Sequence, residues 1–390
     1  MSADDMAASS PTETMARGSL REIVVEFLRL GFVAFGGPPV HFAMMEERFV
    51  RNKQWLTRER FLDLIGAVNL LPGPSSTELT IYLGELRGGF LGLLVAGAGF
   101  ILPAAVMVAG LAWAYQKFGR LPQVEGLLFG IKPVVVALII PALWNLSKVA
   151  LRNIGLAALA VAVVVLAMLG FNVITLLIAA GIFWMLLREA KTLTKSKTSA
   201  SGTIGFLSGV ATLSVGTLPV FFYFLKIGAA VFGSGYVLLA VLRADLVVRL
   251  HWLTDAQLLD AIAVSQATPG PFFTVSTFIG YLLAGWKGAA LATVGMFFPA
   301  FAFVAVTAKF LPRLRKSPLA SAFLDGVNAA AVALMAFVAW QFARAALINV
   351  PAIVLALISL FLLFRYKVNS AWLVLGGAIA GILIQAFARI

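Results

Sequence analysis

Two Pro-Gly-Pro triplets stand inside apolar stretches of the sequence, at 72–74 and 269–271. A proline in a helix interior removes a backbone donor and clashes with a preceding carbonyl, so no helix runs unbroken through two of them. After the first triplet, Pro74 suits a first helical position, and Ser75 to Glu78 could form a capping box. A helix that begins in apolar surroundings presents free amides and a positive dipole end, which attract anions. The two breaks therefore predict an anion-binding site.

A glycine-rich turn precedes each triplet, at Gly36-Gly37-Pro38 and at Gly233-Ser234-Gly235. Glycine lets backbone amides approach a ligand closely, although close helix packing through small residues explains these turns almost as well. Asn69, Ser265 and Gln266 are neutral donors just before the breaks. The residues that we expect to bind substrate at the turns and breaks are Gly36, Gly37, Pro38, Pro72, Gly73, Pro74, Ser75, Gly233, Ser234, Gly235, Gln266, Pro269, Gly270 and Pro271.

Helix dipoles alone are too weak to hold a dianion. A half-charge about 4 Å from a dianion, at an effective dielectric near 20, contributes roughly 4 kcal/mol, so two termini give about 8 kcal/mol. Dehydrating the dianion costs tens of kcal/mol by the ideal Born estimate. We therefore expect a cation or retained water at the site, with Lys132, Arg29 and Lys226 as the candidates. Arg29 and Lys226 lie near segment ends, where each could instead reach the membrane interface.

The remaining ionisable groups are few. Glu78 either caps its helix, the reading we favour, or carries a coupling proton; ionised and exposed to the site, it would repel a dianion. His41 and His251 stand beside loops, where interface exposure is a simpler explanation than function. The chain has no cysteine and no His-Glu-x-x-His or Gly-x-Ser-x-Gly motif, so we expect no metal, no cofactor and no enzyme, with an intramembrane enzyme as a remote alternative.

The composition is that of an all-α protein that crosses a membrane several times. Of 390 residues, 61% are hydrophobic and 12% charged, whereas soluble domains are about half apolar and a quarter charged. The net charge of +13 comes from basic residues in short loops, which positive-inside topology explains without nucleic acid. We expect residues 1–19 to form a disordered tail, with no cleaved signal. Twelve or thirteen apolar segments follow, at about 22–42, 61–83, 90–116, 126–147, 153–169, 171–187, 204–222, 224–242, 258–284, 288–310, 325–348, 351–364 and 371–387.

The second half of the sequence repeats the first. At an offset of 197 residues, Gly31, Trp55 and Asp63 meet Gly228, Trp252 and Asp260, and both Pro-Gly-Pro triplets align; beyond Gly84 the offset becomes 196. Because glycine, proline, tryptophan and aspartate align, a duplication explains the matches better than general apolarity. We expect a first repeat at 20–188, a polar linker at 189–203 and a second repeat at 204–390.

The orientation of the repeats depends on the number of crossings. An even number in each half gives parallel repeats and an odd number gives inverted repeats, and the doubtful segments are 22–42 and 204–222. Basic residues in the linker and at 309–316 place both on the cytoplasmic side. We favour inverted repeats. Duplicated halves with broken helices at matching positions are typical of secondary transporters, whose substrate binds at the repeat interface.

In these motifs the chain resembles the chromate ion transporter family in its long, two-domain form. The resemblance rests on FGGPPVHFAMMEERFV, LPGPSSTELTIYLG, FGSGYVLLAVL and WLTDAQLLDAIAVSQATPGPFFTVSTFIGYLLAGWKGA, and it extends over about residues 20 to 345. It implies a multi-pass inner-membrane protein that exports chromate and confers chromate resistance, with halves in opposite orientation. A departure is Ser234, where the first half has Gly37.

The substrate class and partners follow as expectations. Chromate is the substrate that the resemblance implies, and sulfate or another oxyanion is the alternative because it is also a small tetrahedral dianion. The lipid bilayer is the expected partner, nucleic acid is not, and a homo-oligomer is left open.

Overall fold

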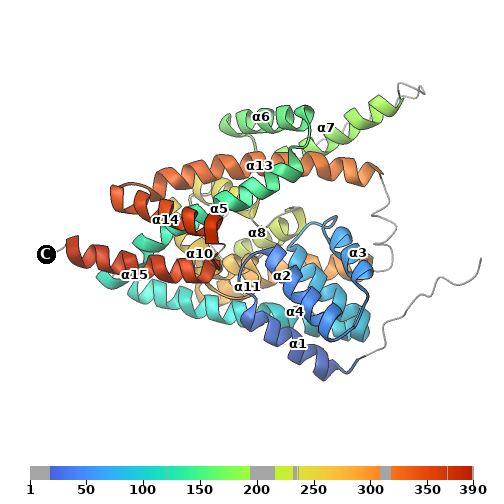
Figure 1. The fold of residues 1–390 in the computed structure, drawn as a ribbon, viewed down its shortest axis with the longest axis horizontal. Helices are drawn as coiled ribbons and strands as arrows, with labels where there is room; N and C mark the ends of the chain where they lie inside the picture. Colours follow the sequence, from blue (N-terminus) through green and yellow to red (C-terminus); the bar gives the residue numbers. More distant parts are fainter. Residues whose placement is uncertain are drawn as a thin grey trace, which may run out of the picture.

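The computed structural model describes residues 18–119, 121–193, 216–231, 235, 237–307, 318–366 and 368–388, which form helices and short connections (Figure 1). Gly233, Ser234 and most of the expected tail and linker lie outside these ranges.

The first expected segment is a helical hairpin instead of a single span. Helix α1 (Leu20–Val33) ends before the Gly36-Gly37 turn, and the chain returns through α2 (Pro38–Met45) and the π-helix η1 (Glu46–Asn52). The buried carboxylate of Glu26 on α1 accepts hydrogen bonds from Arg48 of η1 at 2.5 and 2.8 Å. This pairing holds the two arms antiparallel, so the chain enters the hairpin through α1 and leaves it through η1 at the same face.

A second hairpin follows. Helix α3 (Arg58–Val68) leads to the Pro-Gly-Pro break, after which α4 (Ser75–Phe118) begins. At Gly89 the backbone of α4 turns sharply, with φ 62° and ψ −151°, a conformation that glycine adopts without a Cβ clash. The helix then doubles back, because a Cβ placed on Gly84 would lie 2.4 Å from the carbonyl oxygen of Gly92. Residues 61–83 are therefore also a broken pair of helices.

Three helices complete the first half, namely α5 (Pro122–Ala150), α6 (Ile154–Met168) and α7 (Val173–Leu193). The second half contains α8 (Thr217–Ala230), α9 (Val237–Leu242), η2 (Arg243–Arg249), α10 (Asp255–Ala267), η3 (Phe272–Thr274), α11 (Val275–Thr307), α13 (Pro318–Ala346), α14 (Val350–Tyr366) and α15 (Ser370–Ala388).

The structure confirms the duplication. Helix α8 matches α1 at both ends with an offset of 197, α13 matches α5 with an offset of 196, and the bend at Gly285 has the φ and ψ of Gly89 within 1°. Of the doubtful segment 204–222, the structure describes residues 216–222, most of which belong to α8. That helix also takes in the start of the segment expected at 224–242.

The two halves are inverted. Along the second part of α4, the Gly89 end lies beside the start of α1, because the amide of Gly18 donates to the carbonyl of Arg87 at 3.0 Å. At the other end, Tyr115 donates to Asp260 of α10 at 2.9 Å. Gly270 lies against Ala104, between these ends. Helix α10 therefore enters from the face opposite to the start of α1; we call these the α10 face and the α1 face.

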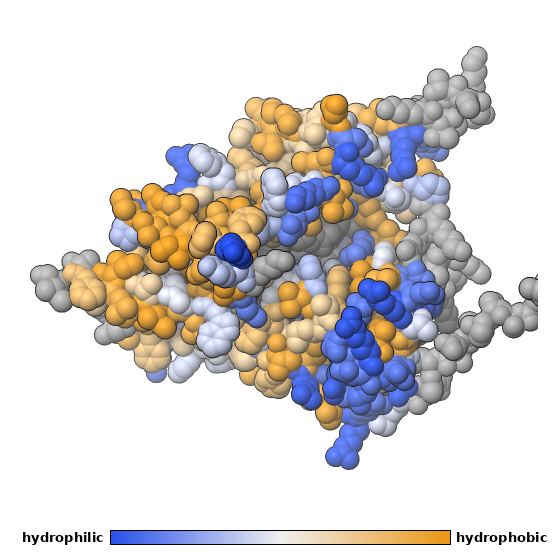
Figure 2. Space-filling view, in the orientation of Figure 1, coloured by the Kyte–Doolittle hydropathy of each residue, from blue (hydrophilic) through white to orange (hydrophobic). Residues whose placement is uncertain are grey.

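The described residues include five helices long and apolar enough to cross a membrane, from α4, α5, α11, α13 and α15. Shorter apolar helices are α6, α8 and α14. Figure 2 shows hydrophilic residues gathered over the end that carries α2 and α3, and mostly apolar residues over α14 and α15. The chain is thus a multi-pass membrane protein in which not every apolar segment is a continuous span.

The helices form two groups. The hairpins of both halves pack together, since α1 lies on α4, α8 on α11, and α11 on α4. The remaining helices form a second group in which α5 packs on α13, α14 and α15, and α13 on α6 and α7. We call these the hairpin group and the outer group.

Candidate functional site

The breaks of both halves meet at one small cavity inside the hairpin group. Its volume is about 20 Å³, which is room for about one water molecule. The residues that line it come from all four turns and breaks: Gly37, Pro38, His41, Pro74, Ser75, Ser76, Gly235, Gln266, Phe272 and Phe273. Six of the expected binding residues are among them, namely Gly37, Pro38, Pro74, Ser75, Gly235 and Gln266.

A pair of symmetric hydrogen bonds links the breaks to the opposite halves. The amide of Gly73 donates to the carbonyl of Val231, at the end of α8, with an N to O distance of 2.8 Å. The amide of Gly270 donates to the carbonyl of Ala34, at the end of α1, also at 2.8 Å. Gly36, Pro72, Pro269 and Pro271 belong to the same turns and breaks but are not among the lining residues.

Helices begin at the cavity from both halves. Helix α4 starts at Ser75 and the η3–α11 segment starts at Phe272, and both residues line the cavity. Helix α2 also starts there, at Pro38, but its first two residues are prolines, which have no N–H to offer. The first amides of a helix have no partner within it and carry its positive dipole end. The cavity is therefore suited to a small anion, and Ser75, Ser76 and Gln266 add neutral polar groups.

Glu78 does not cap α4, contrary to the capping box considered above. The N-cap is Pro74, which has no side-chain cap bond, and both carboxylate oxygens of Glu78 are buried without a hydrogen-bond partner. Its side chain is fully buried and lies against the break, because a Cβ on Gly73 would be 2.6 Å from Oε1. The aligned residue of the second half is Val275, so this carboxylate has no counterpart.

Arg29 and Lys226 do not line the cavity. Both side chains are exposed on the outer faces of α1 and α8, on the same side as exposed Val25 and Phe32 in one helix and Phe222 in the other. Each helix buries its opposite face against the hairpin group, so the cations at these positions point away from the breaks.

Lys132 is also absent from the cavity lining, because it is paired elsewhere. Its Nζ lies 3.1 Å from Oδ1 of Asp260, whose Oδ2 accepts the hydrogen bond from Tyr115. Asp260 is 3% exposed. The ion pair joins α5 of the outer group to α10 of the hairpin group. The carboxylate of Asp260 therefore balances the positive charge of Lys132 that we expected to hold the anion.

The two halves differ in how their hairpins meet the outer group. Helix α10 packs on α5 and α15, and α9 on α13. The matching face of α3 is exposed instead: Leu62 is 48% exposed whereas the aligned Leu259 is 1% exposed. Asp63 is likewise exposed and Asp260 buried. The hairpin group is therefore closed against the outer group near the α10 face and uncovered on α3 toward the α1 face.

Four lining residues were not expected from the sequence, namely His41, Ser76, Phe272 and Phe273, and His41 is the one that can ionise. It is 1% exposed, and its Nε2 lies 3.1 Å from the carbonyl oxygen of Ala34, which also accepts from Gly270. The signal was its position three residues after Pro38, which places it in the first turn of a helix starting at the break. His251 is exposed, as expected.

Comparisons with known proteins agree with the duplicated fold. A model of the family described as "Chromate transporter" matches twice, at residues 21–185 and 218–382. The "Chromate transport protein" of Cupriavidus metallidurans is 34% identical, over 96% of this chain and 97% of its own length. The "Chromate transport protein" of Pseudomonas aeruginosa is 30% identical over 94% of this chain and 92% of its own, and the "Probable chromate transport protein" of Synechococcus elongatus is 28% identical over 94% and 95%.

No solved structure matches the chain. The double match and the full-length relatives show that this chain belongs to the chromate transporter family.

Proposed function

We propose that this protein exports chromate from the cytoplasm by alternating access, and so confers chromate resistance. The observation that carries the proposal is the convergence of helix starts from two inverted halves on one buried cavity. Inverted repeats with broken helices at a central site are the architecture of many secondary transporters. The names of the full-length relatives support chromate as the substrate.

The size of the cavity supports a closed site. About 20 Å³ accommodates about one water molecule, whereas a tetrahedral oxyanion has four oxygens. Binding therefore requires the breaks to separate. The uncovered face of α3 offers a route to them from the α1 face, while the Lys132–Asp260 pair holds the α10 side shut.

The distribution of basic residues supports an orientation with the α1 face in the cytoplasm. The uncovered α3 then makes the conformation inward-facing. Among the described residues, basic side chains are more numerous at the α1 face, with Arg51, Lys53, Arg58, Arg60, Arg87, Lys148, Arg152 and Arg188, than at the α10 face, with Lys117, Arg243, Arg249, Lys287 and Arg344. By the positive-inside rule this face is cytoplasmic. A dianion then enters from the cytoplasm, and its outward movement releases about 4.6 kcal/mol per 100 mV of inside-negative potential. Export on this scheme needs no ATP.

The test is uptake of radiolabelled chromate into everted membrane vesicles that contain the protein. We expect uptake above vesicles that lack it, and a loss of that uptake when an ionophore collapses the membrane potential. Excess sulfate added to the same assay measures selectivity. If sulfate inhibits chromate uptake and is itself taken up by the vesicles, sulfate is also a substrate. Equal chromate uptake by vesicles with and without the protein would contradict chromate export.

A further inference from the structure

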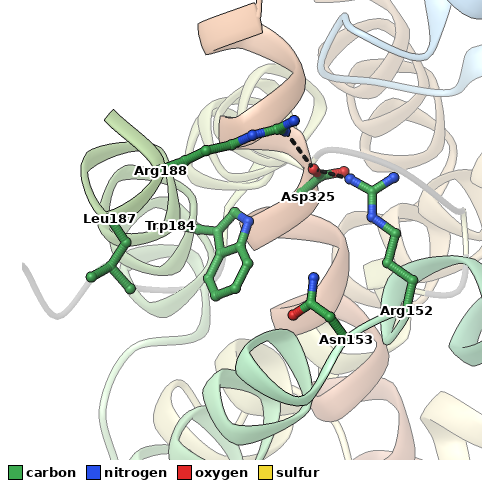
Figure 3. A pocket seen from close by; sticks show the side chains of 6 residues that line it. All are labelled: Arg152, Asn153, Trp184, Leu187, Arg188 and Asp325. Carbon is green, nitrogen blue, oxygen red and sulfur yellow. Dashed lines mark hydrogen bonds and ion pairs between the residues drawn. The ribbon is translucent and has the colours of Figure 1, made fainter. Parts of the chain in front are cut away.

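A second cavity lies in the outer group, on different helices from the breaks. Its volume is about 380 Å³, and it lies between the α5–α6 connection, α7 and α13 (Figure 3). The residues that line it are Arg152, Asn153, Trp184, Leu187, Arg188 and Asp325. It opens at the α1 face, where α5 ends and α7 approaches its own end.

Two guanidinium groups share one carboxylate in this cavity. Arg152 and Arg188 both bond to Oδ2 of Asp325, as Figure 3 shows, and the Arg188 contact is 3.4 Å long. Asp325 is 17% exposed in its side chain, while the arginines are 53% and 54% exposed. The carboxylate contacts both arginines, and the formal charges of the six lining residues sum to +1. Exposed guanidinium groups held in this way suit a phosphate group.

The duplication supplies an internal comparison. In the first-half cavity, the carbonyl of Ala180 on α7 faces Gly326 on α13. In the second half, the repeat-related carbonyl of Gly377 on α15 faces Gly130 on α5 in the same way, so the two sites can be aligned residue by residue. At the α10 face the counterparts of the lining residues carry no charge: Phe129, Ile348, Asn349, Gly381, Ile384 and Gln385. The repeat fold therefore does not require the arginines, and they occur only at the face that the positive-inside rule makes cytoplasmic.

The surroundings of the cavity are apolar on the membrane side. Leu187 in its wall is 38% exposed, and nearby Phe183, Leu186 and Ile154 are 52%, 54% and 89% exposed. Trp184 also lines the cavity, with its ring against Gly155 near the start of α6, and tryptophan is enriched at membrane interfaces. A ligand here meets cationic groups at one end and apolar side chains at the other.

We propose that this cavity binds the phosphate of an anionic phospholipid from the cytoplasmic leaflet, with its acyl chains along Phe183, Leu186 and Leu187. A free oxyanion would share the phosphate chemistry, but the adjoining apolar surface favours the lipid. Basic pockets between membrane helices at the cytoplasmic side are established sites for anionic head groups.

The experiment measures binding of phosphatidylglycerol and phosphatidylcholine to the purified full-length protein by native mass spectrometry. We expect preferential binding of phosphatidylglycerol. The double variant Arg152→Gln/Arg188→Gln should weaken its affinity about 30-fold, since each basic residue near an anionic lipid contributes about fivefold. Lys148→Gln is the matched control, because Lys148 is a basic residue at the same end of α5 that stacks on Trp144 outside the cavity.

A third variant gives the opposite sign and guards against misfolding of the double variant. Asp325→Asn removes the balancing carboxylate and should strengthen phosphatidylglycerol binding about fivefold. Unchanged affinity in both the double variant and Asp325→Asn overturns the proposal. Displacement of the lipid by excess inorganic phosphate, with equal binding of the two lipids, would assign the cavity to a free oxyanion and overturn it as well.

Discussion

Glu78 is a carboxylate next to the cavity that we propose for a dianion, where a negative charge would oppose binding. It lies one turn after Ser75 of the cavity, fully buried, with neither oxygen hydrogen-bonded. An unpaired buried charge is costly, and an ionised Glu78 would repel the substrate. We propose that Glu78 takes up a proton when the anion enters and releases it later in the cycle.

Glu78→Gln keeps the shape of the side chain and removes its titration. We expect the variant to bind chromate, while its uptake rate loses most of the pH dependence that the wild type shows, because the titrating carboxyl group is gone. The measurement is chromate uptake into everted vesicles over a pH series. Glu59→Gln, at an exposed position in the first turn of α3, is the control. A wild-type pH profile in Glu78→Gln would exclude the coupling role.

The Lys132–Asp260 pair leads to a different expectation. Asp260→Asn leaves Lys132 without its partner, and breaking a buried ion pair costs about 3–5 kcal/mol. We expect less folded protein and a lower melting temperature, with partial recovery in Lys132→Gln/Asp260→Asn. The repeat-related Asp63→Asn should have a much smaller effect, because Asp63 is exposed.

Transport by the double variant also separates two roles of Lys132. If Lys132 serves to close the α10 side, the variant with both charges removed still moves chromate, at a changed rate. Complete loss of transport in a well-folded double variant would indicate that Lys132 binds the substrate.

At the scale of the elements, the breaks give the cavity its helix starts. Pro72→Ala and Pro269→Ala each allow α3 or α10 to extend into the break. We expect membrane insertion to persist and chromate export to fall about tenfold, equivalent to roughly 1.4 kcal/mol of lost stabilisation. Pro351→Ala is the control, since Pro351 is an exposed residue in the first turn of α14. Normal export by both break variants at wild-type expression would place the substrate elsewhere.

The sequence predicted these breaks because a proline in a helix interior always removes a backbone N–H donor, whatever surrounds it. It predicted the duplication for the same reason, since aligned Gly, Pro and Asp mark backbone geometry that both halves need. It also placed a segment boundary at each bend, since the expected segments end at residues 83 and 284 and resume at 90 and 288, next to Gly89 and Gly285. The close contact of Gly84 with Gly92, which shows the chain reversing at the first bend, came only from the structure.

The positions of the charged side chains were beyond the sequence. Lys132 and Arg29 occupy apolar segments alike, yet one meets Asp260 from the other half and the other faces outward. Which face of a helix is buried depends on packing partners distant in the sequence: α1 packs on α4, and Lys132 of α5 meets Asp260 of α10. For the same reason, the burial of His41 could not be read from its place near a loop.

At the scale of the whole molecule, the difference between α3 and α10 predicts which residues solvent reaches. The chain has no cysteine, so single cysteines can be labelled without a background. We expect Leu62→Cys to react with a membrane-impermeant thiol reagent in everted vesicles, and Leu259→Cys to be protected. The two positions are aligned in the repeat, so each is the control for the other. Equal labelling of both would contradict an inward-facing state.

The exchanged hydrogen bonds between the halves also bear on how the protein is made. The carbonyl of Ala34 and the amide of Gly73 find their partners at Gly270 and Val231, which the ribosome adds much later. At about 5–20 residues per second, the roughly 200 intervening residues take on the order of 10–40 s to synthesise. During that interval the first half has unpaired backbone groups at membrane depth, which cost several kcal/mol each. The newly inserted first half therefore needs water, lipid head groups or the insertion machinery at its open break until the second half arrives.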